Sequence, residues 1–131
     1  MNVLSESTPA IKQQLEHVME YTVEQLKSIV DEACSAAKVA ATKYFNEKLG
    51  GNDRYACGFA WVSIYEVKGN TRLGRNLKKV GVKQAYDKSF QIWNPSGHHC
   101  QNIDTKEAGA VAAAEVFRKY GFTSYAGGRL D

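Results

Sequence analysis

The sequence predicts an α+β domain in which one long N-terminal helix precedes a β-α-β-α-β unit. Apolar residues recur every three or four positions over residues 9–48, which indicates one face of a helix. The pattern then changes to strand-like alternation, and shorter helical and strand-like segments follow in turn. Residues 55–131 are expected to form a small sheet covered by helices. No linker or repeat divides residues 1–131, so we expect a single domain.

The first helix is expected over residues 9–48. Pro9 follows a Ser-Thr pair, as is typical of a helix start, and neither glycine nor proline occurs again until Gly50. A helix of this length would span about 60 Å, whereas a compact monomer of the same chain is roughly 35 Å across. The helix must therefore bend in the Ala-rich stretch 33–41 or pack its N-terminal half on another subunit. We expect a homo-oligomer, a dimer or larger, held by this helix.

A strand and a short helix are expected next. Residues 55–67 alternate between an aromatic face and a face of small residues, which predicts a strand with both faces largely covered. The small-residue face would let a helix approach closely. Asn70 or Thr71 can cap a short helix that ends at Gly81, and a second strand follows at residues 89–93.

The last helix and strand complete the unit. Residues 104–107 resemble a capping box, so a helix is expected from Asp104 to Tyr120, with Gly121 as its stop. Residues 122–126 are the expected last strand. Residues 127–131 are then a tail that is either mobile or docked.

Composition excludes several classes of protein. With 44% hydrophobic and 24% charged residues, the chain is an ordinary globular domain, neither disordered nor membrane-spanning. Glu6 interrupts the N-terminus, so no secretory signal is recognised. Three cysteines without paired spacing, Cys34, Cys57 and Cys100, favour reduced thiols and an intracellular, cytoplasmic setting. No structural metal and no cofactor is expected.

Positive charge is concentrated in the middle of the chain. Residues 54–86 hold seven Lys or Arg and one Glu, although the net charge of the whole chain is only +3. Such a block is compatible with an anionic partner, or with a solvated helix face.

The strongest local motif is the glycine-bearing turn at residues 68–75, which leads into the short helix. Backbone N–H groups at the helix start, the side chain of Asn70 and the guanidinium groups of Arg72 and Arg75 would together suit a phosphate or carboxylate. Lys79 shares the helix face of the two arginines. Acidic residues of the first helix could instead neutralise this face. The turn lacks the glycine patterns of nucleotide-hydrolase and dinucleotide sites.

A polar loop follows the second strand. Trp93, Asn94 and His98 have the donors and aromatic surface of a binding rim, and His98 or His99 is a candidate acid–base group. Adjacent residues rarely point at one metal ion, and no second ligand pair has suitable spacing, so we predict no metal site. A polar loop without chemistry is the alternative.

Two further features are candidate contact surfaces. The aromatic side chains of the first strand could stack with bases; they are Tyr55, Phe59, Trp61 and Tyr65. A place in the core or in a subunit interface is favoured, because an exposed aromatic surface of this size would be unusual. Arg129 follows two glycines and could act as a second anion clamp, or form a salt bridge at a docked terminus.

Four stretches carry a resemblance to a family: GNTRLGRNLKKVG, IWNPSGHH, KEAGAVAAAEVFRKYGF and SYAGGRLD. They are similar to small uncharacterised proteins of bacteriophages and prophages, over roughly residues 55–131. The resemblance implies a phage-like context, the cytoplasm of an infected or lysogenic bacterial host, and no particular activity. It highlights Asn70, Arg72, Gly74, Arg75, Trp93, Asn94, Pro95, Gly109 and Arg129.

The leading hypothesis is a small, non-enzymatic, phage-type accessory protein. It would recognise an anionic partner, a nucleic acid or a phosphorylated small molecule, through the basic turn and helix. One alternative is an enzyme that uses His98 or His99, with Arg72 or Arg75 holding an anionic substrate. A second alternative is a purely structural protein, in which the basic helix docks on the acidic first helix.

Overall fold

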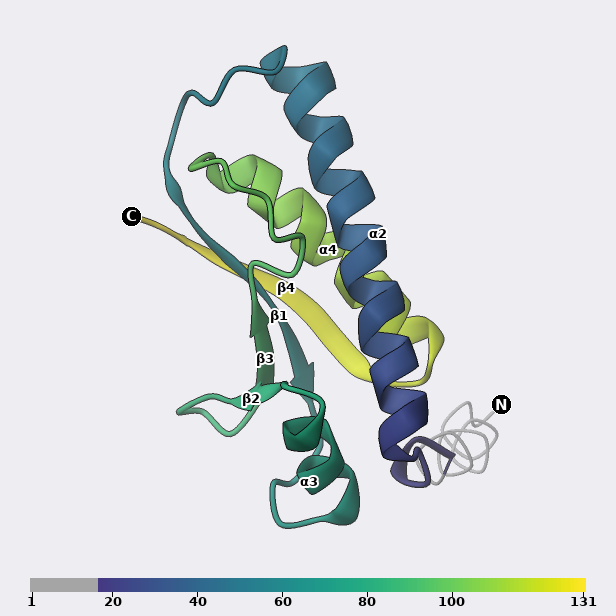
Figure 1. The fold of residues 1–131 in the computed structure, drawn as a ribbon. Coiled ribbons are helices and arrows are strands. Elements are labelled where there is room, and N and C mark those ends of the chain that lie inside the picture. Colours follow the sequence, from purple (N-terminus) through teal and green to yellow (C-terminus); the bar gives the residue numbers. More distant parts are fainter. Residues whose placement is uncertain (1–16) are drawn as a thin grey trace, which may run out of the picture.

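A computed structural model describes residues 17–131 of the chain (Figure 1). It confirms the α+β class and the long helix that precedes the sheet. The elements, in chain order, are α2 (Val23–Leu49), β1 (Gly58–Tyr65), α3 (Arg72–Lys79), β2 (Lys83–Gln84), β3 (Phe90–Trp93), α4 (Ile103–Lys119) and β4 (Thr123–Leu130).

The four strands form one antiparallel sheet in the order β2-β3-β1-β4. After α2 the chain therefore runs β-α-β-β-α-β with β1 and β3 in the centre, which is the split β-α-β arrangement. Strand β2 was not expected, because its two residues are too few to show a pattern and depend on pairing with Gln91 and Phe90.

The helices lie on one face of this sheet. Val62 and Ile64 of β1 are buried in a core with Phe117 of α4 and Ile29 of α2. The small-residue face of β1 is thus the helix side, as the sequence predicts. Figure 1 shows α2 beside α4 along its length, with α3 at the lower end of the molecule. The two long helices approach closely, since a Cβ atom on Gly109 would lie only 3.1 Å from the Ala37 carbonyl oxygen.

The prediction of one continuous helix over residues 9–48 is wrong for residues 17–48, the part that the structure describes. Residues 17–19 are helical, but the helix stops there, and α2 starts afresh at Val23. Thr22 caps it in a capping box with Gln25, in which each side chain accepts a hydrogen bond from the other's backbone N–H. Residues 9–16 lie outside the described residues. The 27 residues of α2 span about 40 Å, so α2 fits the domain without a second subunit.

The other boundaries shift for local reasons. Asn102, not residues 104–107, caps α4, because its Oδ1 accepts hydrogen bonds from both the N–H and the hydroxyl of Thr105, at 2.8 and 2.9 Å. β4 continues to Leu130 because it pairs with β1 along its whole length, ending opposite Gly58. The expected tail at 127–131 is therefore largely part of the sheet.

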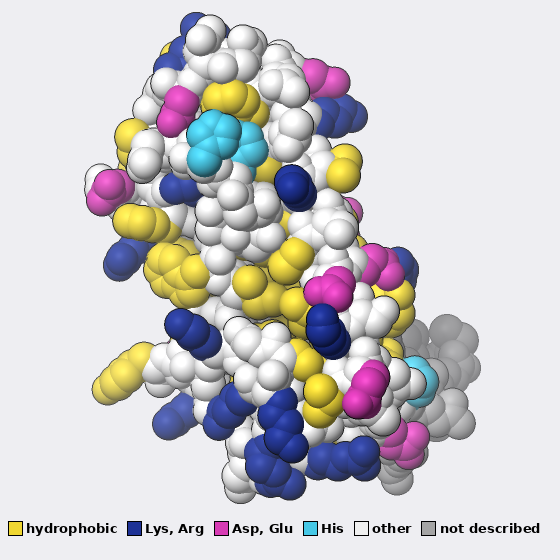
Figure 2. Space-filling model, in the orientation of Figure 1, with side chains coloured by type: hydrophobic (Ala, Val, Ile, Leu, Met, Phe, Trp, Pro, Cys, Tyr) yellow, Lys and Arg dark blue, Asp and Glu magenta, His cyan; other side chains and the backbone are white. Residues whose placement is uncertain are grey.

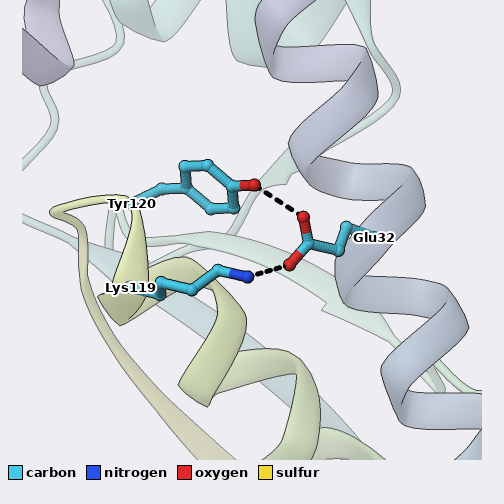
Figure 3. A network of polar contacts seen from close by, with 3 residues as sticks. All are labelled: Glu32, Lys119 and Tyr120. Atoms are coloured by element: carbon cyan, nitrogen blue, oxygen red, sulfur yellow. Dashed lines mark hydrogen bonds and ion pairs between the residues drawn. The ribbon is translucent and has the colours of Figure 1, made fainter.

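Glu32 of α2 fastens the two long helices together (Figure 3). Its carboxylate accepts a hydrogen bond of 2.6 Å from the Tyr120 hydroxyl and forms an ion pair with Lys119. These contacts lower the pKa of Glu32, chiefly through Lys119, and the carboxylate in turn raises the pKa of Tyr120. In the described residues Glu32 thus pairs with Lys119 of α4 and Asp31 with Lys27 of α2 itself, and no ion pair joins α2 to the basic helix α3.

Among the described residues, no helix is both long enough and apolar enough to cross a membrane.

Candidate functional site

The face of the sheet opposite the helices carries no covering element from residues 17–131. Strand register decides which side chains share it, because partners across the sheet point the same way. Within the described chain the helices cover one face only, and cover of the other face by a second subunit stays a prediction. We call this surface the open face; it comprises Phe59, Trp61, Ser63 and Tyr65 of β1, Lys83 of β2, Gln91 and Trp93 of β3, and Thr123, Tyr125, Gly127 and Arg129 of β4.

Three aromatic rings form the centre of the open face, and we call them the aromatic platform. Trp61 and Trp93 are cross-strand partners whose rings stack, with centroids 4.7 Å apart and 29° between the planes. Phe59 meets Trp93 edge-on at 6.0 Å. Trp93 is 49% exposed and Phe59 36% exposed, so both rings present surface to solvent.

A glycine in β4 makes room for this arrangement. Gly127 lies directly across from Trp61, and a Cβ atom there would be 2.5 Å from the indole Nε1. The Trp61 ring therefore lies over the backbone of β4, in the space that a side chain at position 127 would fill. The indole N–H of Trp93 is held by the Gln91 side chain, to which it donates at 3.1 Å. The platform is thus positioned by its neighbours on both sides.

Cationic groups flank the platform at the Phe59 end. The Arg129 guanidinium carbon lies 5.5 Å from the Phe59 ring centroid and 5.8 Å from that of Trp93, within the range of cation–π attraction. Lys106 of α4 is buried, and its Nζ donates to the Gly58 carbonyl at 3.0 Å while lying 5.6 Å from the Phe59 ring. Neither cation forms an ion pair within residues 17–131.

A second pair of aromatic residues extends the open face. Tyr65 and Tyr125 are 38% and 58% exposed, with ring centroids 6.3 Å apart. Arg118 lies 5.6 Å from the Tyr125 ring and donates to the Ser124 carbonyl at 2.6 Å. The open face therefore offers aromatic rings with cations beside them along most of β1.

The predicted basic turn folds into a capped helix start. The Thr71 hydroxyl accepts a hydrogen bond from the Gly74 N–H at 3.1 Å, which occupies one of the free N–H groups. Arg75 turns back and donates to the Asn70 carbonyl at 2.7 Å. Arg72 is exposed, and neither arginine has an ion-pair partner within residues 17–131. Lys79 lies at the far end of α3, in a shallow hollow next to the start of α2.

The histidine loop packs against the C-terminal part of α2 through His98, whereas His99 is exposed. The rings of His98 and His99 stack at 4.7 Å, and His98 also contacts Phe45 of α2. The His98 Nδ1 accepts a hydrogen bond of 3.2 Å from the Cys100 N–H, and its backbone carbonyl accepts one from the Asn94 side chain. Burial, with the nearby His99 as a second cause, lowers the pKa of His98.

The cysteine next to this loop does not form a Cys-His pair. The Cys100 thiol is buried and points toward the Asn102 carbonyl, not toward an imidazole, and burial raises its pKa. All three cysteines are free. Within residues 17–131, no three His, Cys, Asp or Glu side chains cluster as a metal site would require.

The structure divides the predicted site residues among separate places. Trp93 and Arg129 come together on the open face, and Asn70 and Arg75 in the turn before α3. Arg129 lies opposite Phe59, near the start of β1, whereas α3 follows the end of β1, about 20 Å away. The His98 loop lies by the C-terminal part of α2, at the upper end of Figure 1, and α3 at the lower end. One small substrate cannot touch both His98 and Arg72.

Lys106 was missed by the sequence analysis, and Phe59 and Trp61 were considered there mainly as core. Their period-two spacing was the available signal, but spacing does not show which face the helices cover. A comparison of the chain with protein-family models, with curated proteins and with solved structures finds no match in any of the three.

Proposed function

We propose that this chain is a non-enzymatic protein that binds single-stranded nucleic acid on its open face. The observation that carries the proposal is the aromatic platform of Phe59, Trp61 and Trp93, with the Arg129 guanidinium beside two of its rings. Proteins bind single strands by stacking bases on exposed aromatic side chains while cations contact the phosphates. The fold alone would not support this, since one fold serves many functions.

Exposure of the platform supports a ligand over a purely structural role. A contiguous group of exposed apolar side chains on a folded domain is typical of an interaction site, whereas isolated exposed ones are common. The rings here are held in place by Gly127 and by the Gln91 side chain, so little ordering remains to be done when a base stacks. Arg129 supplies a cation without a competing carboxylate among the described residues.

Two wider elements of the proposal rest on the sequence alone. A phage-type accessory role in a bacterial cytoplasm rests on the resemblance of residues 55–131, and self-association is proposed from the apolar pattern of residues 9–48. Light scattering at micromolar concentration tests the second, and a monomer would contradict it. If a second copy covers the open face, platform substitutions will change the measured mass.

The test is a titration with an unstructured oligothymidylate at low salt, in which binding is monitored by tryptophan fluorescence. Trp93→Ala should weaken binding by about fivefold to a hundredfold, because stacking of one base contributes roughly 1–3 kcal/mol. Tyr86→Ala is the control, since Tyr86 is fully exposed on the β2–β3 hairpin and outside the platform. Absence of binding by the wild-type protein, or equal binding by Trp93→Ala, would contradict the proposal.

A further inference from the structure

A second binding surface lies between the turn before α3 and the β2–β3 hairpin. It is a hollow of about 520 Å³ that we call the three-lysine pocket. Lys68 of the turn, Lys78 of α3 and Lys88 of the hairpin line it, together with the amide side chains of Asn70 and Gln84. None of its lining residues is acidic. Figure 2 shows Lys and Arg side chains gathered at this lower end of the molecule.

Among the described residues, the positive charges at this pocket outnumber the negative charges nearby. Neither ion pair in residues 17–131 involves one of the three lysines. The nearest acidic side chains, Glu66 and Asp87, line an adjacent hollow. Glu66 accepts a hydrogen bond from the Thr123 hydroxyl at 2.9 Å, and Asp87 accepts from the Ser89 hydroxyl at 2.6 Å. Lys68 and Lys88 also line the hollow of these two acids. Neither carboxylate forms an ion pair with a lysine of the pocket, so three positive charges lie beside two negative ones.

Lys88 of the pocket has a backbone conformation that lysine rarely adopts. Its φ of +75° lies in the left-handed region, which glycine and asparagine adopt with less strain than lysine. The hairpin imposes this conformation, since the Lys88 N–H donates to Ala85 and its carbonyl accepts from the Gln84 side chain. A lysine in a strained backbone conformation at the rim of a basic hollow suggests a role other than stability.

Cationic side chains connect this pocket to the aromatic platform. Lys83 of β2 lies on the open face opposite Gln91, and Gln91 in turn holds Trp93. The hairpin that starts at β2 then carries Lys88 into the pocket. A chain of negative charges that passes around the edge strand β2 would meet positive side chains from the open face to α3, which lies on the helix side of the sheet.

We propose that the three-lysine pocket binds a phosphate group of the strand whose bases stack on the aromatic platform. This inference rests on the proposed function and names its phosphate contact. Lysine ammonium groups bind phosphate as point charges, without the fixed geometry that arginine requires. Arg72 and Arg75, which the sequence suggested for this role, do not line the pocket.

The test compares two doubly substituted proteins with the same change of charge. The pocket variant carries Lys78→Gln and Lys88→Asn, and the control carries Lys38→Gln and Lys43→Asn on the exposed side of α2. Binding of an octathymidylate and of a dithymidylate is measured over a range of salt concentrations. The octamer is long enough to reach from the platform to the pocket, and the dimer spans the platform alone.

We expect the pocket variant to bind the octamer about tenfold more weakly at low salt. The magnitude of the slope of log K against log salt should fall by about 0.7, since the pocket contacts one phosphate and each phosphate contact on a single strand contributes about 0.7. Binding of the dimer should change no more than in the control. The melting temperature should not fall below that of the control, because Lys88→Asn relieves backbone strain. If the pocket variant has an unchanged slope while Trp93→Ala binds the oligonucleotide more weakly, phosphate binding by the pocket is refuted and the proposed function is supported.

A second measurement covers the case in which wild-type protein binds neither oligonucleotide, which would refute the proposed function. Tripolyphosphate is then titrated while the backbone amides are followed by NMR. Shifts at Gly69 and Asn70 that disappear in the pocket variant support phosphate binding by the pocket itself. Shifts confined to other residues, or none, overturn it.

Discussion

Gly127→Ala should displace one ring of the aromatic platform without removing any aromatic residue. The new Cβ would lie 2.5 Å from Nε1 and 2.7 Å from Cε2 of Trp61, whereas ordinary contacts begin at 3.4 Å. The indole must therefore move by about 0.9 Å, away from the position in which it stacks on Trp93 at 4.7 Å. Stacking of one base contributes roughly 1–3 kcal/mol, and a displaced ring loses only part of it, about 1–1.4 kcal/mol, so we expect oligothymidylate affinity to fall about fivefold to tenfold.

The matched control is Gly128→Ala, the same change one residue along β4. There the Cβ would meet the flexible end of the Glu107 side chain at 2.6 Å, on the helix face of the sheet, and the Phe59 carbonyl oxygen at 3.1 Å, but no ring of the platform. Circular dichroism reports the stacked indole pair of the platform, and fluorescence titration reports affinity. Unaltered affinity in Gly127→Ala despite a changed circular dichroism signal would refute the platform as the base-binding surface, as would equal losses in both variants.

Three further predictions concern stability and the basic helix. Burial, and secondarily His99, lower the pKa of His98 from its ordinary 6.5. The stability linked to neutral His98 is therefore complete above pH 6.5 and is lost as the pH falls through the lower pKa of the folded state. The melting temperature of His98→Asn should not show this fall with pH, and that of His99→Asn should. Asn102→Ala should lower the free energy of unfolding by about 2–3 kcal/mol in chemical denaturation, because α4 loses its cap and the part-buried carbonyl of Arg54 loses its donor. Arg72→Ala with Arg75→Ala should weaken oligonucleotide binding by less than about threefold in a gel-shift assay, and a loss of tenfold or more would place the interface on α3.

The elements that could be predicted from the sequence are those whose pattern is local and repeated. The period of two in β1 and the small-residue face turned to the helices are both found in the structure. The start of α2 was missed because the apolar pattern continues across residues 20–22. The capping box of Thr22 and Gln25 was the signal that could have revealed it. Strand β2 has two residues and forms because it pairs with β3, so no local sequence pattern predicts it.

The candidate site was harder to predict because it depends on pairing between distant segments. A strand with one aromatic and one small face is compatible with burial of both, and only the absence of a described element over the aromatic face shows it open. Trp93 was expected at the rim of a loop beside His98. In the structure it is the last residue of β3, and its pairing with Trp61 places it on the platform.

Charge along the chain is also a poor guide to charge in space. The basic block of residues 54–86 separates into the three-lysine pocket, the solvated arginines of α3, and Lys83 on the open face. The cation at the platform comes instead from Arg129, which is positioned by the register between β4 and β1. Side chains alternate along a strand, so a slip of one residue would carry Arg129 to the helix face and place a side chain where Gly127 now admits Trp61. The alternation of Tyr125, Gly127 and Arg129 therefore specifies the candidate site as much as the aromatic residues of β1 do.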